Sequence, residues 1–166
     1  LGFHNAVRLA SGVAMMAALW FLYLAARHGT VAKGEARPAG AGATLLLMGS
    51  VGLIVHAHEA VPDLATLAAS CSALCFLSFR NRNIKHGIAF GASLGIAFLS
   101  TGPVMPVVLG ATALVAHLAC DEWRNARAWR FLGAALAAFA VLAVSWPLAL
   151  WLRSPELAQA WWHGAS

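Results

Sequence analysis

Residues 88–119 read IAFGASLGIAFLSTGPVMPVVLGATALVAHLA, an apolar stretch without Asp, Glu, Lys or Arg. As a single helix this stretch would be about 48 Å long, whereas the hydrocarbon core of a bilayer is about 30 Å thick. Gly102-Pro103 and Pro106 interrupt it, and a proline removes a backbone donor and clashes with the preceding turn. We therefore predict two short helices with a corner near residues 101–103.

The composition excludes most soluble classes of protein. Of the 166 residues, 61% are hydrophobic and only 10% are charged, whereas about a quarter of a soluble domain is charged. These figures exclude a disordered chain and a collagen-like fibre, and the three cysteines contain no CxxC pair that would indicate a disulfide or zinc scaffold. The net charge of +5 comes from short basic clusters between apolar blocks, which is typical of membrane loops and not of nucleic-acid binding.

The remaining apolar blocks are also typical of membrane helices. A spanning helix needs about 20 residues, and no alternation typical of β-strands competes with these blocks. We predict an all-α, polytopic transmembrane helix bundle of about six spans, with residues 1–166 forming a single transmembrane domain. The predicted blocks are 6–26, 40–55, 64–79, 88–100, 104–119 and 131–152.

The distribution of charge supports this topology. If six spans alternate, nine of the 11 Lys and Arg residues fall on one side, and only Arg8 and Arg153 fall on the other. Cytoplasmic loops carry such an excess of positive charge, so both termini are expected outside, in the periplasm or its equivalent. The nine residues are Arg27, Lys33, Arg37, Arg80, Arg82, Lys85, Arg124, Arg127 and Arg130.

Glycines recur every four residues at Gly87, Gly91 and Gly95, which gives two overlapping GxxxG patterns. Small residues at this spacing let membrane helices approach closely. We therefore expect a tightly packed seam between helices here.

The loop HAHEAVPD at 56–63 is the polar exception on the predicted outer side. Ionisable groups at such a depth are candidates for function. His56, His58, Glu59 and Asp63 are considered as metal ligands, but their spacing matches neither HExxH nor a closed zinc site. The alternative for the histidines is an interfacial position, where an amphipathic ring is tolerated.

Asp63 and Arg153 each have a structural and a functional interpretation. Asp63 precedes the predicted helix 64–79, where aspartate is a favoured N-cap worth about 1 kcal/mol. Its functional alternative is a carboxylate that acts as a base, a metal ligand or an acceptor for a sugar hydroxyl. Arg153 opposes the charge bias on the outer side, so we expect an anionic partner, either a lipid phosphate or Glu156.

Four short motifs follow one another along almost the whole chain. They are NAVRL at 5–9, HAHEAVPD at 56–63, GIAFLSTGP at 95–103 and SWPLALWLRSPE at 145–156. In order, spacing and hydropathy they resemble the glycosyltransferase family 39 proteins of bacterial inner membranes, which include aminoarabinose transferases and relatives of dolichyl-phosphate-mannose-protein mannosyltransferases. Two positions depart from the family pattern: Thr101 stands where the family has lysine, and Trp146-Pro147 inverts a Pro-Trp pair.

The resemblance implies a membrane region of the GT-C type and a sugar donor linked to polyprenyl phosphate. An acceptor hydroxyl attacks the anomeric carbon and polyprenyl phosphate leaves, so the site needs a carboxylate base and a cation or metal at the phosphate. Asp63 matches the loop acid of the family and is the predicted catalytic residue. We expect substrate binding by His56, His58, Glu59 and Arg153, and we assign no cofactor beyond the chance that a divalent metal takes part.

The chain begins after the first loop of the family pattern, which carries an acidic motif. We therefore expect part of a longer inner-membrane transferase that is inactive alone and that, when complete, transfers a sugar to a lipid or other acceptor on the periplasmic side. Its expected partners are the lipid-linked donor, membrane lipids and the missing parts of the transferase, with no nucleic acid. The alternative is a non-catalytic polytopic module, such as a transporter fragment or an assembly subunit. A transporter should show an inverted repeat or a polar residue in mid-membrane.

Overall fold

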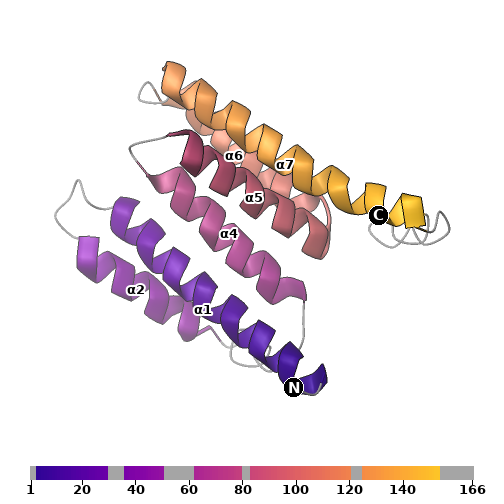
Figure 1. The fold of residues 1–166 in the computed structure, drawn as a ribbon. Helices are drawn as coiled ribbons and strands as arrows, with labels where there is room; N and C mark the ends of the chain where they lie inside the picture. Colours follow the sequence, from indigo (N-terminus) through magenta and orange to yellow (C-terminus); the bar gives the residue numbers. More distant parts are fainter. Residues whose placement is uncertain (1–2, 30–35, 51–61, 80–82, 121–124, 154–166) are drawn as a thin grey trace. The chain divides into compact units, whose positions relative to one another are not determined.

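Every regular element in the described part of the chain is an α-helix, which confirms the all-α prediction. The chain divides into two compact units, residues 1–82 and 83–166, each with three described helices (Figure 1). The computed structural model describes residues 3–29, 36–50, 62–79, 83–120 and 125–153.

The first unit is organised around its long helix. Helix α1 (Phe3–Gly29) packs against both α2 (Ala36–Met48) and α4 (Pro62–Ser78). Along α1 and α4, Phe21 meets Phe76 with ring centroids 5.9 Å apart, and His28 meets Phe79 at 4.3 Å. Because the two contacts follow the same order in both segments, α1 and α4 run parallel.

Helix α2 returns antiparallel along the second half of α1. Its close approach occurs at Gly40, where an added Cβ would lie 2.8 Å from Cε2 of Tyr23. The α2 helix was expected over 40–55, but it begins at Ala36 and ends at Met48, followed by a turn in which Ser50 Oγ donates to the Leu47 carbonyl. At about 20 Å, α2 is shorter than the hydrocarbon core of a bilayer.

The second unit contains the predicted corner. Helix α5 (Ile84–Thr101) ends where expected, and α6 (Val104–Ala119) follows after two residues. Gly102 has φ 87°, a backbone conformation that favours glycine, and its N–H donates to the Phe98 carbonyl. Pro103 then stands directly before α6, where a missing N–H costs no helical hydrogen bond. The break is therefore made by glycine and proline acting together.

The predicted glycine seam joins α5 to α7 (Ala126–Arg153). The glycines lie so close to α7 that an added Cβ would collide with it, mostly with backbone atoms. Phe90 and Phe131 flank the seam at 5.6 Å, and Phe98 and Phe139 at 6.0 Å, so α5 and α7 are parallel. The facing pairs are Gly87 with Phe131, Gly91 with Ala135, and Gly95 with Leu142.

Both units bury small residues and expose large apolar ones. Cys71, Ala73 and Cys75 are buried in α4, and both cysteines are free, which agrees with a packing role. Large exposed side chains run along α1, α2, α6 and α7, an amount of apolar surface that soluble proteins rarely leave open. Only α1 and α7, among the described helices, are both long and apolar enough to cross a membrane by the usual criteria, while α2, α4 and α6 are shorter apolar helices.

Candidate functional site

Asp63 is exposed in the first turn of α4. The helix begins at Pro62, so Asp63 is its second residue and not its N-cap, which corrects the capping interpretation. Proline is favoured as the first helical residue because its missing N–H would have no partner there. The carboxylate of Asp63 still lies near the positive end of the α4 dipole, an interaction worth about 0.3–1 kcal/mol. The structural role of this acid is therefore smaller than that of a cap, and its side chain is open to solvent or ligand.

The beginning of α1 lies at the same end of the first unit as Asp63. Phe21 contacts Phe76, and thirteen residues before these two positions lie Arg8 and Asp63. Because α1 and α4 run parallel, positions 8 and 63 are each about 20 Å from the phenylalanine contact along their own helix. Position 8 was noted in the sequence only as an exception to the charge bias, and the helix pairing brings it into consideration as a site residue.

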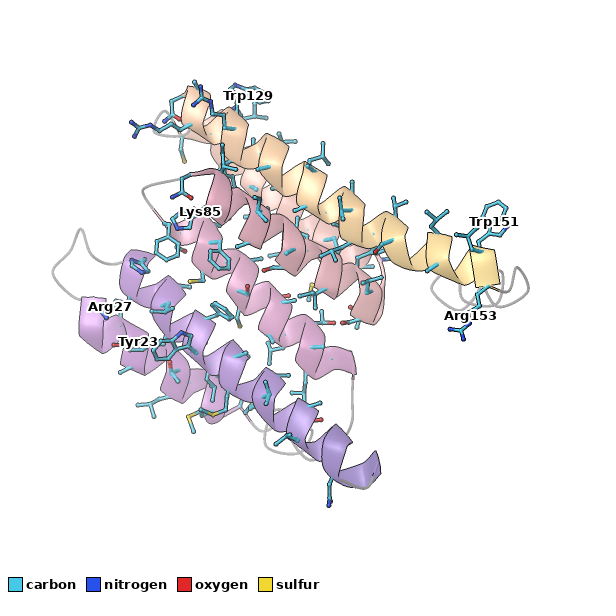
Figure 2. The ribbon with its side chains drawn as sticks, viewed as in Figure 1. Tyr23, Arg27, Lys85, Trp129, Trp151 and Arg153 are labelled. Atoms are coloured by element: carbon cyan, nitrogen blue, oxygen red, sulfur yellow. The ribbon has the colours of Figure 1, made fainter. Side chains whose placement is uncertain are left out.

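The opposite end of the first unit carries its basic groups. Arg27 and His28 occupy the last turn of α1, and Figure 2 shows Arg27 at the end of the helix that lies away from the N-terminus. Lys85 lies in the first turn of α5 in the second unit, and Arg127 and Arg130 lie in the first turns of α7. In each unit the residues of the predicted basic side therefore lie at one end of the helices, whereas Arg8 and Arg153 lie at the opposite ends.

Arg153 is the last residue of α7 and is exposed. A cation in the last turn is favoured by the negative end of the helix dipole, which gives Arg153 a structural role as well. It lies at the opposite end of α7 from Arg127 and Arg130, beyond Trp151 (Figure 2). Its guanidinium is therefore available to an anion at this end of the second unit.

The other predicted ligands lie outside the described residues. His56, His58 and Glu59 belong to the segment 51–61, so their predicted role in substrate binding stays a prediction. Within the described residues, no group of three or more His, Cys, Asp or Glu side chains could hold a metal ion. The loop on which the metal hypothesis depended is not among those residues.

His117 lies in the last turn of α6. It is 5% exposed, and its ring packs against Trp129 in an edge-on contact with centroids 4.6 Å apart. Its Nδ1 has no hydrogen-bond partner among the described residues. The sequence offers one signal for this contact. Because the end of α6 and the start of α7 must lie at the same end of the unit, His117 and Trp129 are expected near each other.

Comparison with known proteins bears directly on these features. Residues 3–151 match the dolichyl-phosphate-mannose-protein mannosyltransferase family, a match that extends from the start of α1 almost to the end of α7. No curated protein and no solved structure matches the chain. The family match agrees with the resemblance of the four motifs and with an all-helical, apolar architecture. The chain belongs to the dolichyl-phosphate-mannose-protein mannosyltransferase family and is a membrane glycosyltransferase of the GT-C type.

Proposed function

We propose that the chain forms part of a transferase that uses a sugar linked to polyprenyl phosphate and passes it to a lipid or other acceptor at the periplasmic surface of the bacterial inner membrane. The acceptor hydroxyl attacks the anomeric carbon, the bond from that carbon to the phosphate oxygen breaks, and polyprenyl phosphate leaves. Asp63 takes the proton of the attacking hydroxyl. The observation that carries this assignment is the exposed carboxylate of Asp63 in the first turn of α4, at the end of the unit away from Arg27 and His28.

The helix directions support a topology in which this end is external. In the first unit α1 and α4 are parallel and α2 is antiparallel, and in the second unit α5 and α7 are parallel. Six alternating spans require this order of directions within each half. The same alternation puts the basic ends of both units on the cytoplasmic side and assigns Asp63 and Arg153 to the periplasmic side.

Arg153 is the cation that we assign to the phosphate of a lipid at the outer surface. A guanidinium presents several N–H donors in a plane and binds phosphate with two parallel hydrogen bonds, which an ammonium group does not. Its place at the end of an apolar helix of 28 residues puts it at headgroup depth, provided that α7 spans the membrane. We assign His56, His58 and Glu59, together with Asp63, to the sugar or acceptor.

The position of charge along the helices argues against the transporter alternative. In the described helices every Lys, Arg, Asp and Glu lies within the first or last two turns. A transporter that binds an ion at mid-membrane is expected to carry charged groups there. The arrangement instead favours chemistry at a membrane surface, as a reaction of a lipid phosphate requires.

The test of the catalytic assignment is Asp63→Asn in the complete protein. Asparagine keeps the size of the side chain and removes the charge and the proton-accepting capacity. Transfer from polyprenyl-phosphate-mannose and from polyprenyl-phosphate-aminoarabinose should fall by about 10²-fold or more. Unfolding free energy should change by less than about 1 kcal/mol, because only the dipole interaction is lost.

Two controls make this test specific. Asp121→Asn removes a carboxylate on the predicted cytoplasmic side and should leave transfer unchanged. Asp63→Glu keeps the charge and should retain more activity than Asp63→Asn. Full activity of a folded Asp63→Asn protein would remove Asp63 from the catalytic machinery.

Native Cys120 offers a test of the topology. It is free and exposed directly after α6, whereas Cys71 and Cys75 are buried. A membrane-impermeant thiol reagent should reach Cys120 only from the cytoplasmic side. In a Thr101→Cys variant it should reach position 101 only from the periplasmic side. Labelling of both positions from one side would contradict a spanning α6.

A further inference from the structure

Helix α7 carries two exposed tryptophans near its two ends. Trp129 is 64% exposed and Trp151 is 68% exposed, and Figure 2 shows both rings on the outer side of the helix. The two positions are 22 residues apart, which corresponds to about 33 Å along the helix axis and to a rotation within about 40° of six full turns. The two rings therefore lie on nearly the same face, one helix length apart.

The residues between the two tryptophans on this face are apolar and exposed. Leu136 and Val144 are 69% and 58% exposed, and Ala140 lies between them. The opposite face of the helix is the one that packs on α5, where Phe131 and Ala135 are buried. We name the outer face the tryptophan stripe, defined by Trp129, Leu136, Ala140, Val144 and Trp151.

Cations lie at or just beyond both ends of the tryptophan stripe. Arg127 and Arg130 are exposed at the beginning of α7, and Arg153 is exposed at its last residue. Trp129 is held in place on its other side by the buried ring of His117. Aromatic rings at both limits, arginines at and beyond them and an apolar surface between them are the pattern that a bilayer selects in a spanning helix.

We propose that the tryptophan stripe contacts the acyl chains of the bilayer directly, with the bilayer midplane at Ala140. A tilt of about 20° reduces the distance of about 33 Å to about 31 Å across the membrane, close to the thickness of the hydrocarbon core. The arginines at the two ends then meet lipid phosphates, so the charges are complementary at both surfaces. A covering protein helix would not require two tryptophans at bilayer spacing with cations at both limits.

This inference fixes which side of the transferase faces lipid. It does not depend on the donor, on the acceptor or on Asp63. It implies that no further helix of the complete transferase covers this face of α7. It also gives Arg153 a depth in the membrane, at the level of the outer phosphates.

The experiment is a nitroxide scan of α7 in vesicles of phosphatidylethanolamine and phosphatidylglycerol. Cys71, Cys75 and Cys120 are replaced by alanine or serine, and single cysteines are introduced along the helix. Collision rates with molecular oxygen, which concentrates in lipid, and with a nickel chelate, which stays in water, are measured at each label. The labelled positions are 126, 135, 136, 140 and 144.

The expected result separates lipid, water and protein contacts. At 136, 140 and 144 oxygen collisions should be frequent and nickel collisions rare, with the highest ratio of oxygen to nickel at 140. Position 135, which is next to 136 but is buried against α5, is the matched control and should be poorly accessible to both. Position 126 is exposed at the start of α7 and should be accessible to nickel.

Each other outcome overturns the inference in a defined way. Low collision rates for both reagents at 136, 140 and 144 would mean that protein covers the stripe. Frequent nickel collisions there would mean that the face is aqueous. A maximum more than one turn away from 140 would contradict the depth. Transfer activity of the same labelled proteins reports on the proposed function separately.

Discussion

Replacement of Gly91 by alanine tests whether the α5–α7 seam depends on backbone contact. An added Cβ at this position would collide with the Ala135 carbonyl oxygen and would lie 2.7 Å from its carbonyl carbon and 2.8 Å from its Cα. These are backbone atoms, so relief requires that the two helices move apart. Added volume in a well-packed interface typically costs about 1–3 kcal/mol.

The matched control is Gly133→Ala in α7, where an added Cβ meets nothing within 4 Å. Alanine favours a helix over glycine by about 0.8–1.0 kcal/mol, so this variant should be as stable as the wild type or more stable. Gly95→Ala should be intermediate, because its Cβ would lie 2.7 Å from the Cβ of Leu142, which the backbone holds in place, and 2.8 Å from its Cδ1, which a change of rotamer can move. The expected order of stability is Gly133→Ala, then Gly95→Ala, then Gly91→Ala.

The assay is unfolding by SDS titration in mixed micelles, followed by near-ultraviolet circular dichroism. This signal reports on fixed aromatic side chains, and the pairs Phe90–Phe131 and Phe98–Phe139 lie on either side of Gly91 and Gly95. The two alanine variants at 91 and 133 should differ by about 1–3 kcal/mol in unfolding free energy, because both gain the helix propensity of alanine and only Gly91→Ala carries the cost of overpacking. A Gly91→Ala protein that is as stable as Gly133→Ala would refute a seam of contacting backbones.

Three further variants test other contacts. Gly40→Ala should destabilise the protein in the same assay because its Cβ would lie 2.8 Å from the Tyr23 ring. Gly42→Ala should not, because the space around its Cβ is open. Adding Tyr23→Ala to Gly40→Ala should reduce the loss of unfolding free energy. Asn83→Ala should cost about 0.5–2 kcal/mol because Oδ1 of Asn83 accepts a hydrogen bond of 3.0 Å from the His86 N–H, and Asn83→Asp should retain most of the stability. Arg153→Gln should raise the KM for the donor with an unfolding free energy within about 1 kcal/mol of the wild type, and an unchanged KM would leave Arg153 as a dipole or headgroup contact.

The helices were predictable where one strong local signal marked their ends. At the Gly102-Pro103 corner, glycine tolerates a left-handed conformation and proline lacks a backbone N–H donor. Helix α6, which follows this corner, has the predicted bounds. The seam at Gly87, Gly91 and Gly95 was predicted from spacing alone, because small residues have few other roles in a membrane helix. Which helix would face those glycines depended on the parallel pairing of α5 with α7, which no local pattern contains.

The candidate site was less predictable because it depends on helix ends and on loops. Asp63 was expected to cap a helix that begins at residue 64, but α4 begins two residues earlier, at Pro62. That change matters chemically, because a capping carboxylate accepts backbone N–H groups, whereas a carboxylate at the second position is exposed. Position 8 could not have been associated with Asp63 from the sequence, since the association depends on the contact between Phe21 and Phe76.

The packing of helices within each unit explains why function should lie at the helix ends. Small residues make up much of their interiors, beside the buried rings of Phe90 and Phe131, and the helices approach closely enough that Gly91 leaves no space for a methyl group. Among the residues whose burial is described, no Lys, Arg, Asp or Glu lies in these interiors, so no such charge is placed there to polarise a bond. Charged side chains of the described helices are restricted to the terminal turns, where water, lipid phosphates and loops meet. A membrane glycosyltransferase built in this way requires its acid and its phosphate-binding cation at the surface, and on the outer side of the predicted topology Asp63 and Arg153 meet that requirement among the described side chains.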